Sequence, residues 1–234
     1  EKTRQDLTLP AWACESLEEE RRLAAMKMLL ENELVRLDSK MVTLPHNGRR
    51  VKVVTAFPDV YSDFRLLRFL RTDKIQDPVT AAMRYRDYLQ WREHNDIDAI
   101  RAMVEARAFE PPPALSVVEN YLPCEFRGES SRDGSVPILL QVGSWDTAAI
   151  TQLIRKNDEL PLSAFLQYWT YMFDSLHSHL YQESIKEKQL VFIDEVCALI
   201  GMSLTQFSPA FFSPVLQPWL EFTLSYTSQT AQLI

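Results

Sequence analysis

The sequence predicts an α/β fold in which an all-helical N-terminal lobe precedes an α/β lobe with a sheet covered by helices. Two observations predict it. Apolar residues recur at helical spacing as far as residue 108, and two apolar runs typical of buried strands, VPILLQV (136–142) and QLVFIDEV (189–196), flank a long helical segment. Strand, helix and strand at this spacing form a βαβ unit, which implies a sheet with helices packed on it.

Residues 1–57 form an N-terminal extension with an amphipathic helix. Ser16 and Glu19 have the spacing of a capping box, in which two side chains satisfy backbone amides at a helix start. One apolar stripe follows at spacings of three and four: Leu23, Met26, Leu30, Leu34, Leu37 and Met41. The stripe of this helix, at 16–41, either packs on its own domain or meets a protein partner, and the packing role is the commoner one.

Residues 58–110 form a helical lobe. LPHNGRR (44–50) is a turn before it, and Pro58 begins a helix at a position where its missing amide costs nothing. DFRLLRFLRTDK (63–74) then sets three arginines, at every third residue, into an apolar run. We expect them along one edge of the helix, paired with carboxylates or phosphate: Arg65, Arg68 and Arg71.

The next helix of this lobe starts at Asp77-Pro78 and ends at His94-Asn95. Its aromatic side chains predict a packed interior, and we expect Tyr88 and Trp91 in the core. A short helix over 97–108 completes the lobe.

Residues 111–234 form the α/β lobe, after the polyproline hinge at 111–113. SSRDGS (130–135) is a hairpin-type turn before the first strand. A helix follows Pro161 over 161–181, and apolar helical material at 204–226 closes the chain.

Composition excludes several classes of protein. The net charge of −7 argues against nonspecific binding to nucleic acid, because that binding requires a basic face. No CxxC pair joins the three cysteines, so we expect neither a zinc site nor a disulfide framework, and a reducing compartment. No apolar run reaches the ~20 residues that span a bilayer. We expect a soluble or peripheral membrane protein, cytoplasmic unless a targeting signal precedes Glu1.

The titratable residues do not form a catalytic set. His177 and His179 are two apart on a helix and point to different faces, so they cannot grip one metal ion. Asp174 and His177 share a face, but no GxSxG turn accompanies them. No glycine-rich nucleotide loop is present either. We expect a protein that is not an enzyme and that has no cofactor or metal.

Three segments in order resemble the CRAL-TRIO family, the lipid-binding modules of retinaldehyde-binding, tocopherol-transfer and yeast-type phosphatidylinositol-transfer proteins. FLRTDKIQDPVTAAMRYRDYLQWRE (69–93) is similar to that family's N-terminal helical motif with its Trp-Arg pair. YLPCEFRGESSRDGSVPILLQVGSWD (121–146) resembles its D-G-(R)-P-V strand and the turn after it. LVFIDEV followed by GMSLTQFSP (190–209) resembles its IID-G-S-S strand and the loop beyond. The resemblance covers residues 58–226.

The resemblance implies binding or transfer of a hydrophobic ligand, a lipid or an isoprenoid, with transient contact to a membrane surface. It also implies that the arginines brace the helical lobe against the other lobe or meet headgroups. The implied cavity walls are Leu139, Gln141, Phe192, Met202, Leu204, Phe207 and Phe222. The implied polar anchors are Lys74, Ser203 and Thr205.

The sequence also departs from the family pattern. Asp73 stands where members that bind phosphoinositide have arginine, Leu139 replaces an aromatic residue, and Tyr226-Thr227-Ser228 lacks the expected carboxylate. We therefore expect a neutral or zwitterionic lipid or an isoprenoid. The sequence stops at Ile234, before the family's gate helix, so we expect an incomplete lobe. The alternative is a scaffold or accessory subunit of a larger, membrane-associated complex, which uses the fold for protein contacts.

Overall fold

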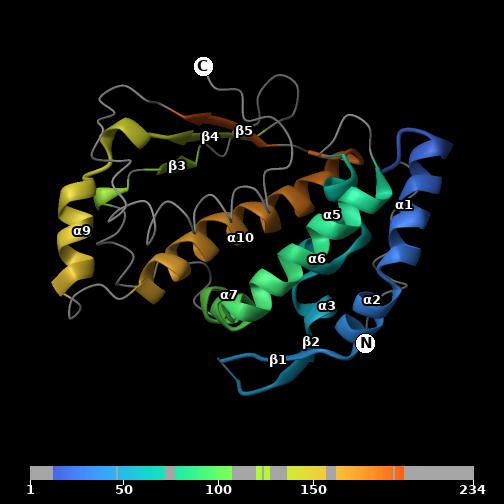
Figure 1. Cartoon of the computed structure of the whole chain (residues 1–234), viewed down its shortest axis with the longest axis horizontal. Coiled ribbons are helices and arrows are strands. Elements are labelled where there is room, and N and C mark those ends of the chain that lie inside the picture. Colours follow the sequence, from blue (N-terminus) through green and yellow to red (C-terminus); the bar gives the residue numbers. More distant parts are fainter. Residues whose placement is uncertain are drawn as a thin grey trace. The chain divides into compact units, whose positions relative to one another are not determined.

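Helices make up most of the chain that the computed structural model describes, and two small sheets accompany them, so the fold is mixed and rich in helix (Figure 1). The described residues are 13–45, 47–71, 77–106, 120–122, 124–126, 136–156, 162–191 and 193–197. The chain divides into two compact units. The first unit holds residues 1–106 and 176–191, and the second unit holds residues 107–175 and 192–234.

The N-terminal segment is two helices, α1 (Leu17–Leu29) and α2 (Glu31–Ser39), so the prediction of one helix over 16–41 is wrong. The helix is interrupted at Leu30, where Arg86 donates a hydrogen bond to the neighbouring carbonyl of Leu29. The sequence does not predict this break, because apolar residues keep their spacing of three and four across it.

The apolar stripe of α1 and α2 packs within the first unit, as the commoner role requires. Five of its six members are buried: Leu23, Met26, Leu30, Leu34 and Leu37. Met41 is exposed and lies in strand β1 (Met41–Thr43). The exposed large apolar residues of the two helices are Leu17, Met28, Leu29 and Val35.

Strand β1 pairs antiparallel with β2 (Arg50–Lys52) around the predicted turn. The amide of Gly48 donates to the carbonyl of Leu44 at 2.9 Å, which closes the turn. Gly48 has a φ of +65°, a left-handed conformation that glycine adopts without a steric penalty.

Five helices follow in the first unit, which confirms the helical prediction for the described residues between 58 and 106. They are α3 (Val53–Ala56), α4 (Pro58–Tyr61), α5 (Asp63–Leu70), α6 (Pro78–His94) and α7 (Ile97–Ala106). Pro58 and Pro78 occupy first helical turns as expected. Asp77 caps α6, since its carboxylate accepts hydrogen bonds from the amides of Val79 and Thr80.

The core of the first unit joins α5, α6 and the end of the long helix α10 (Leu162–Glu187). Tyr88 is fully buried, as predicted, and contacts Phe69 with a ring separation of 5.4 Å. Phe64 meets Tyr181 of α10 edge to face at 5.4 Å. The prediction that Trp91 lies in this core is wrong, because its side chain is only half-buried.

The second unit contains a three-stranded sheet in the order β3 (Cys124–Phe126), β4 (Val136–Leu140), β5 (Ile193–Cys197). β3 and β4 are antiparallel, and β4 and β5 are parallel. The chain between the parallel strands contains a short 3₁₀ turn, η2 (Val142–Ser144), helix α9 (Thr147–Lys156) and α10. The predicted strands therefore lie next to each other in one sheet, connected by helices.

The strand and helix limits differ from the predicted ones. β4 ends two residues before the predicted limit of 142, and β5 begins at Ile193 rather than at residue 189. α10 continues to Glu187, beyond the predicted limit of 181. The polyproline hinge, the turn at 130–135 and the apolar segment at 204–226 lie outside the described residues, so they stay predictions.

Candidate functional site

Two of the ten residues implied for the ligand cavity are described, and both belong to the region of strand β4. Leu139 lies in the strand and Gln141 follows its end, and both side chains are half-buried. The others lie outside the described residues or have side chains that the structure does not describe: Lys74, Phe192, Met202, Ser203, Leu204, Thr205, Phe207 and Phe222.

Leu139 occupies the middle strand of the sheet. Its backbone lies opposite Glu125 of β3 and Val196 of β5. The next residue, Leu140, is 2% exposed. Successive side chains of a strand point to opposite faces, so at this point one face of the sheet is closed and the other retains accessible apolar surface.

A cluster of aromatic side chains around Trp169 forms part of the core of the second unit. The Trp169 ring on α10 lies 6.3 Å from Trp145, 4.8 Å from Tyr168 and 6.0 Å from Phe173. The hydroxyl of Tyr168 donates to the carbonyl of Leu122 at 3.0 Å. These buried rings fix the N-terminal half of α10 within the second unit.

The three arginines of the run at 63–74 all bind partners within the first unit; Arg65 and Arg68 lie in α5 and Arg71 directly follows it. Arg65 is buried, and its Nη1 lies 3.1 Å from Nδ1 of His177. Arg68 donates to the carbonyl of Val191 at 2.7 Å. Arg71 forms a bidentate ion pair with Glu19: its Nε and Nη2 donate to the two carboxylate oxygens, each at 2.7 Å. Pairing with a carboxylate is one of the two predicted roles, and Arg71 fulfils it.

These arginines change the titration of their neighbours. Burial would raise the pKa of Glu19, but hydrogen bonds from Arg71 and from the amide of Glu15 outweigh it and lower the pKa. Burial lowers the pKa of His177 well below its usual value, and the charges of Arg65 and Arg68 lower it further. Because Arg65 can only donate, Nδ1 of His177 accepts, which requires the neutral ring.

Sequence reasoning missed a second buried charge cluster, centred on Asp98 of α7. Its carboxylate accepts hydrogen bonds from Arg92 at 2.9 Å, Lys40 at 2.8 Å and Tyr61 at 2.6 Å. Burial would raise the pKa of Asp98, but the charges of Arg92 and Lys40 outweigh it and lower the pKa. Arg92, half of the Trp-Arg pair in the sequence motif, is thus a core residue with its own counter-charge.

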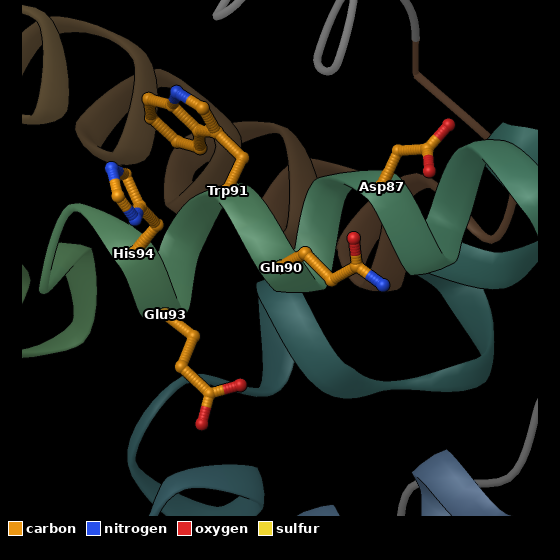
Figure 2. Close-up of a pocket in the computed structure, with 5 residues that line it drawn as sticks. All are labelled: Asp87, Gln90, Trp91, Glu93 and His94. Atoms are coloured by element: carbon orange, nitrogen blue, oxygen red, sulfur yellow. The ribbon is translucent and has the colours of Figure 1, made fainter.

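An open pocket of about 580 Å³ lies along the exposed side of α6 (Figure 2). Its lining residues are Asp87, Gln90, Trp91, Glu93 and His94. Figure 2 shows Asp87, Trp91 and His94 rising from one side of the helix. Their spacing of four and three residues is visible in the sequence, which predicts Trp91 in the core instead.

The described residues contain no group of three or more histidine, cysteine or acidic side chains arranged to hold a metal ion. In the same part of the chain, no helix combines the length and the apolar character needed to cross a membrane.

Comparison with known proteins adds no family assignment. No protein-family model matches the chain, and no curated protein matches its sequence.

Proposed function

We propose that the protein binds a hydrophobic ligand, a lipid or an isoprenoid, on the sheet of its second unit and carries it without catalysing a reaction. This is the function implied by the resemblance to the CRAL-TRIO family. The proposal rests above all on Leu139, a half-buried apolar residue at the centre of a sheet whose adjacent residue Leu140 is buried. Ligand cavities need such apolar walls and only a few polar groups.

The topology around Leu139 also supports the proposal. β4 and β5 are parallel neighbours connected through helices. In open α/β sheets, ligands bind outside the carboxyl ends of the strands. Gln141 directly follows the carboxyl end of β4 and supplies a polar group there.

The apolar part of a lipid supplies enough free energy for retention. Burying about ten methylenes contributes about 8 kcal/mol, at ~0.8 kcal/mol for each. That value corresponds to roughly micromolar affinity. Asp73 would repel an anionic headgroup, so the proposal favours neutral and zwitterionic lipids and isoprenoids.

Lipid uptake by the whole chain tests the proposal. The purified protein is incubated with phosphatidylcholine vesicles that contain small amounts of phosphatidylinositol, its phosphates and an isoprenol, and bound lipid is identified by native mass spectrometry. We expect one neutral or zwitterionic ligand for each protein. Selective uptake of phosphatidylinositol phosphates would contradict the headgroup argument.

Two tryptophan substitutions sharpen this test. Leu139→Trp should fill the apolar face of the sheet and lower uptake about tenfold, which corresponds to about 1.4 kcal/mol. Ile185→Trp changes a residue that is also partly exposed, at 41%, but belongs to the first unit, and uptake should be unchanged. Thermal unfolding must show that both variants are folded. If the wild-type chain takes up no lipid, the scaffold function is favoured instead.

A further inference from the structure

The β1–β2 hairpin concentrates positive charge on an acidic protein. Residues 39–58 contain four lysine and arginine side chains and no aspartate or glutamate, whereas the whole chain has a net charge of −7. One of the four, Lys40, is paired with a buried carboxylate. Arg49, Arg50 and Lys52 make no ion pair with any other residue that the structure describes. The hairpin therefore carries positive charge that the protein itself does not neutralise.

The register of the hairpin gives it an inner and an outer face. Val42 lies opposite Val51, and Val42 is buried, so this face packs onto the first unit. Residues opposite each other in an antiparallel pair share a face. The outer face thus carries the other two pairs, Met41 with Lys52 and Thr43 with Arg50. Lys52 is half-buried and the other three are exposed. In Figure 1 the hairpin extends away from the helices of its unit.

The turn of the hairpin adds apolar surface beside these charges. Pro45 and Arg49 are exposed, and Leu44 is half-buried. The amide of Leu44 donates to the carbonyl of Arg49 at 2.8 Å, and the amide of Gly48 donates to the carbonyl of Leu44 at 2.9 Å, so the backbone of the turn is fixed. Cations next to exposed apolar side chains are typical of protein surfaces that lie on a lipid bilayer, where headgroups meet acyl chains.

We propose that this hairpin docks the protein on a surface of anionic phospholipid. Arg49, Arg50 and Lys52 lie against the headgroups, and Leu44 and Pro45 enter the boundary with the acyl chains. The net negative charge of the chain opposes contact through its other faces, so the hairpin orients the approach. Nucleic acid is a poorer partner, because its binding depends on neutralising many phosphates and gains little from an apolar tip.

The docking surface and the proposed ligand site are separate assignments. The hairpin belongs to the first unit, and Leu139 belongs to the second unit. Failure of the protein to take up lipid would leave the docking proposal intact, and failure to dock would leave the ligand site intact.

Cosedimentation of the whole chain with sucrose-loaded vesicles tests the proposal. One set of vesicles is an equimolar mixture of phosphatidylcholine and phosphatidylserine, and the other set is phosphatidylcholine alone. We expect the protein to pellet with the mixed vesicles and to stay in solution with the others. Added salt should release it, because salt screens exposed charges. Equal binding to both sets, or no binding to the mixed vesicles, would overturn the proposal.

Neutralising the hairpin locates the surface. Each lysine or arginine near an anionic membrane contributes roughly fivefold to binding, so the triple variant Arg49→Gln, Arg50→Gln, Lys52→Gln should bind the mixed vesicles about 100-fold more weakly. The matched control is Arg21→Gln, Arg84→Gln, Lys188→Gln, which removes three exposed positive charges outside the hairpin. The control should lose less than about threefold. Equal losses would show only a general charge effect and would overturn the assigned surface.

Two further measurements separate docking from other causes. Leu44→Ser keeps every charge and should weaken binding about threefold, because it removes only part of the apolar contact. Thermal unfolding must show that the variants are folded. A labelled single-stranded oligonucleotide is titrated at the same salt concentration, and binding tighter than that to the mixed vesicles, lost in the hairpin variant, would assign the surface to nucleic acid and overturn the proposal.

Discussion

The two units of the molecule bury different chemistry. In the first unit the guanidinium groups of Arg65, Arg92 and Arg101 lie in the core, 4.9 to 5.9 Å from the centres of aromatic rings. In the described core of the second unit, the largest side chains are rings packed on rings, with Trp169 at the centre.

This difference teaches which unit suits an apolar ligand. A buried charge is tolerated only where a specific partner compensates its lost hydration, as Asp98 does for Arg92. The stability of such a core depends on pH and on the presence of each charged partner. The stability of a core of aromatic rings depends instead on how well the rings fill space, and an apolar ligand could pack against it without leaving a charge unpaired.

The largest expected loss of stability comes from a substitution in the charged core of the first unit. Asp98→Ala removes the buried carboxylate that pairs with Arg92 and should cost about 3–5 kcal/mol in the free energy of unfolding. Urea titration followed by circular dichroism measures it. Asp87→Ala, on the exposed side of α6, is the control and should change stability by less than about 0.5 kcal/mol.

The Asp98→Ala effect should also depend on pH. The pKa of Asp98 is lowered in the folded protein, so its contribution is complete above the unfolded value of 3.8 and is lost as the pH falls through the folded value. A loss as large at pH 3 as at pH 7 would contradict the role of the charge.

A substitution in the aromatic core of the second unit should lower the free energy of unfolding by as much, but this loss should not depend on pH. Trp169→Ala removes a side chain that is 1% exposed and should cost about 3–5 kcal/mol. Urea titrations at pH 4 and pH 7 should give the same difference from the wild type. If the variant proves as stable as the wild type, the contacts of Trp169 with its neighbours do not stabilise the second unit.

A smaller effect is expected from His177. Its pKa is lowered below the usual 6.5, so the unfolded chain takes up a proton first, and stability should decline as the pH falls from 6.5 towards the folded value. His177→Gln does not titrate and can accept the hydrogen bond from Arg65, so its stability should vary less between pH 7 and pH 5. Parallel pH profiles of the two proteins would exclude His177 as the cause.

The smallest effect concerns the hydroxyl of Tyr168. Tyr168→Phe removes its hydrogen bond to Leu122 and should cost about 1 kcal/mol. Tyr181→Phe keeps the ring contact with Phe64 and serves as the control, with an expected change below about 0.5 kcal/mol. Thermal unfolding compares the two variants, and equal losses would show that the bond contributes nothing specific.

The sequence by itself determined the local elements and their neighbours in the sheet. Asp77 and Pro78 start α6, because a capping carboxylate and a fixed φ both favour that position, and Gly48 allows the turn between β1 and β2. The apolar runs that became β4 and β5 were recognisable because buried strands are continuously apolar. For the cavity, the sequence supplied Leu139 and Gln141 as candidates, and the structure describes both as half-buried.

Only the tertiary structure decided which side chains of the helices are buried. Hydrophobicity favoured Trp91 for the core of α6, yet the core takes Arg92 and leaves Trp91 half-exposed. The reason is that Asp98 accepts hydrogen bonds from Arg92 in the folded unit and offsets the cost of burying its charge. Lys40 and Tyr61 donate hydrogen bonds to the same carboxylate and hold it in place. The counter-charge of Arg92 belongs to the next helix, six residues along the sequence, and the periodicity of α6 contains no information about it.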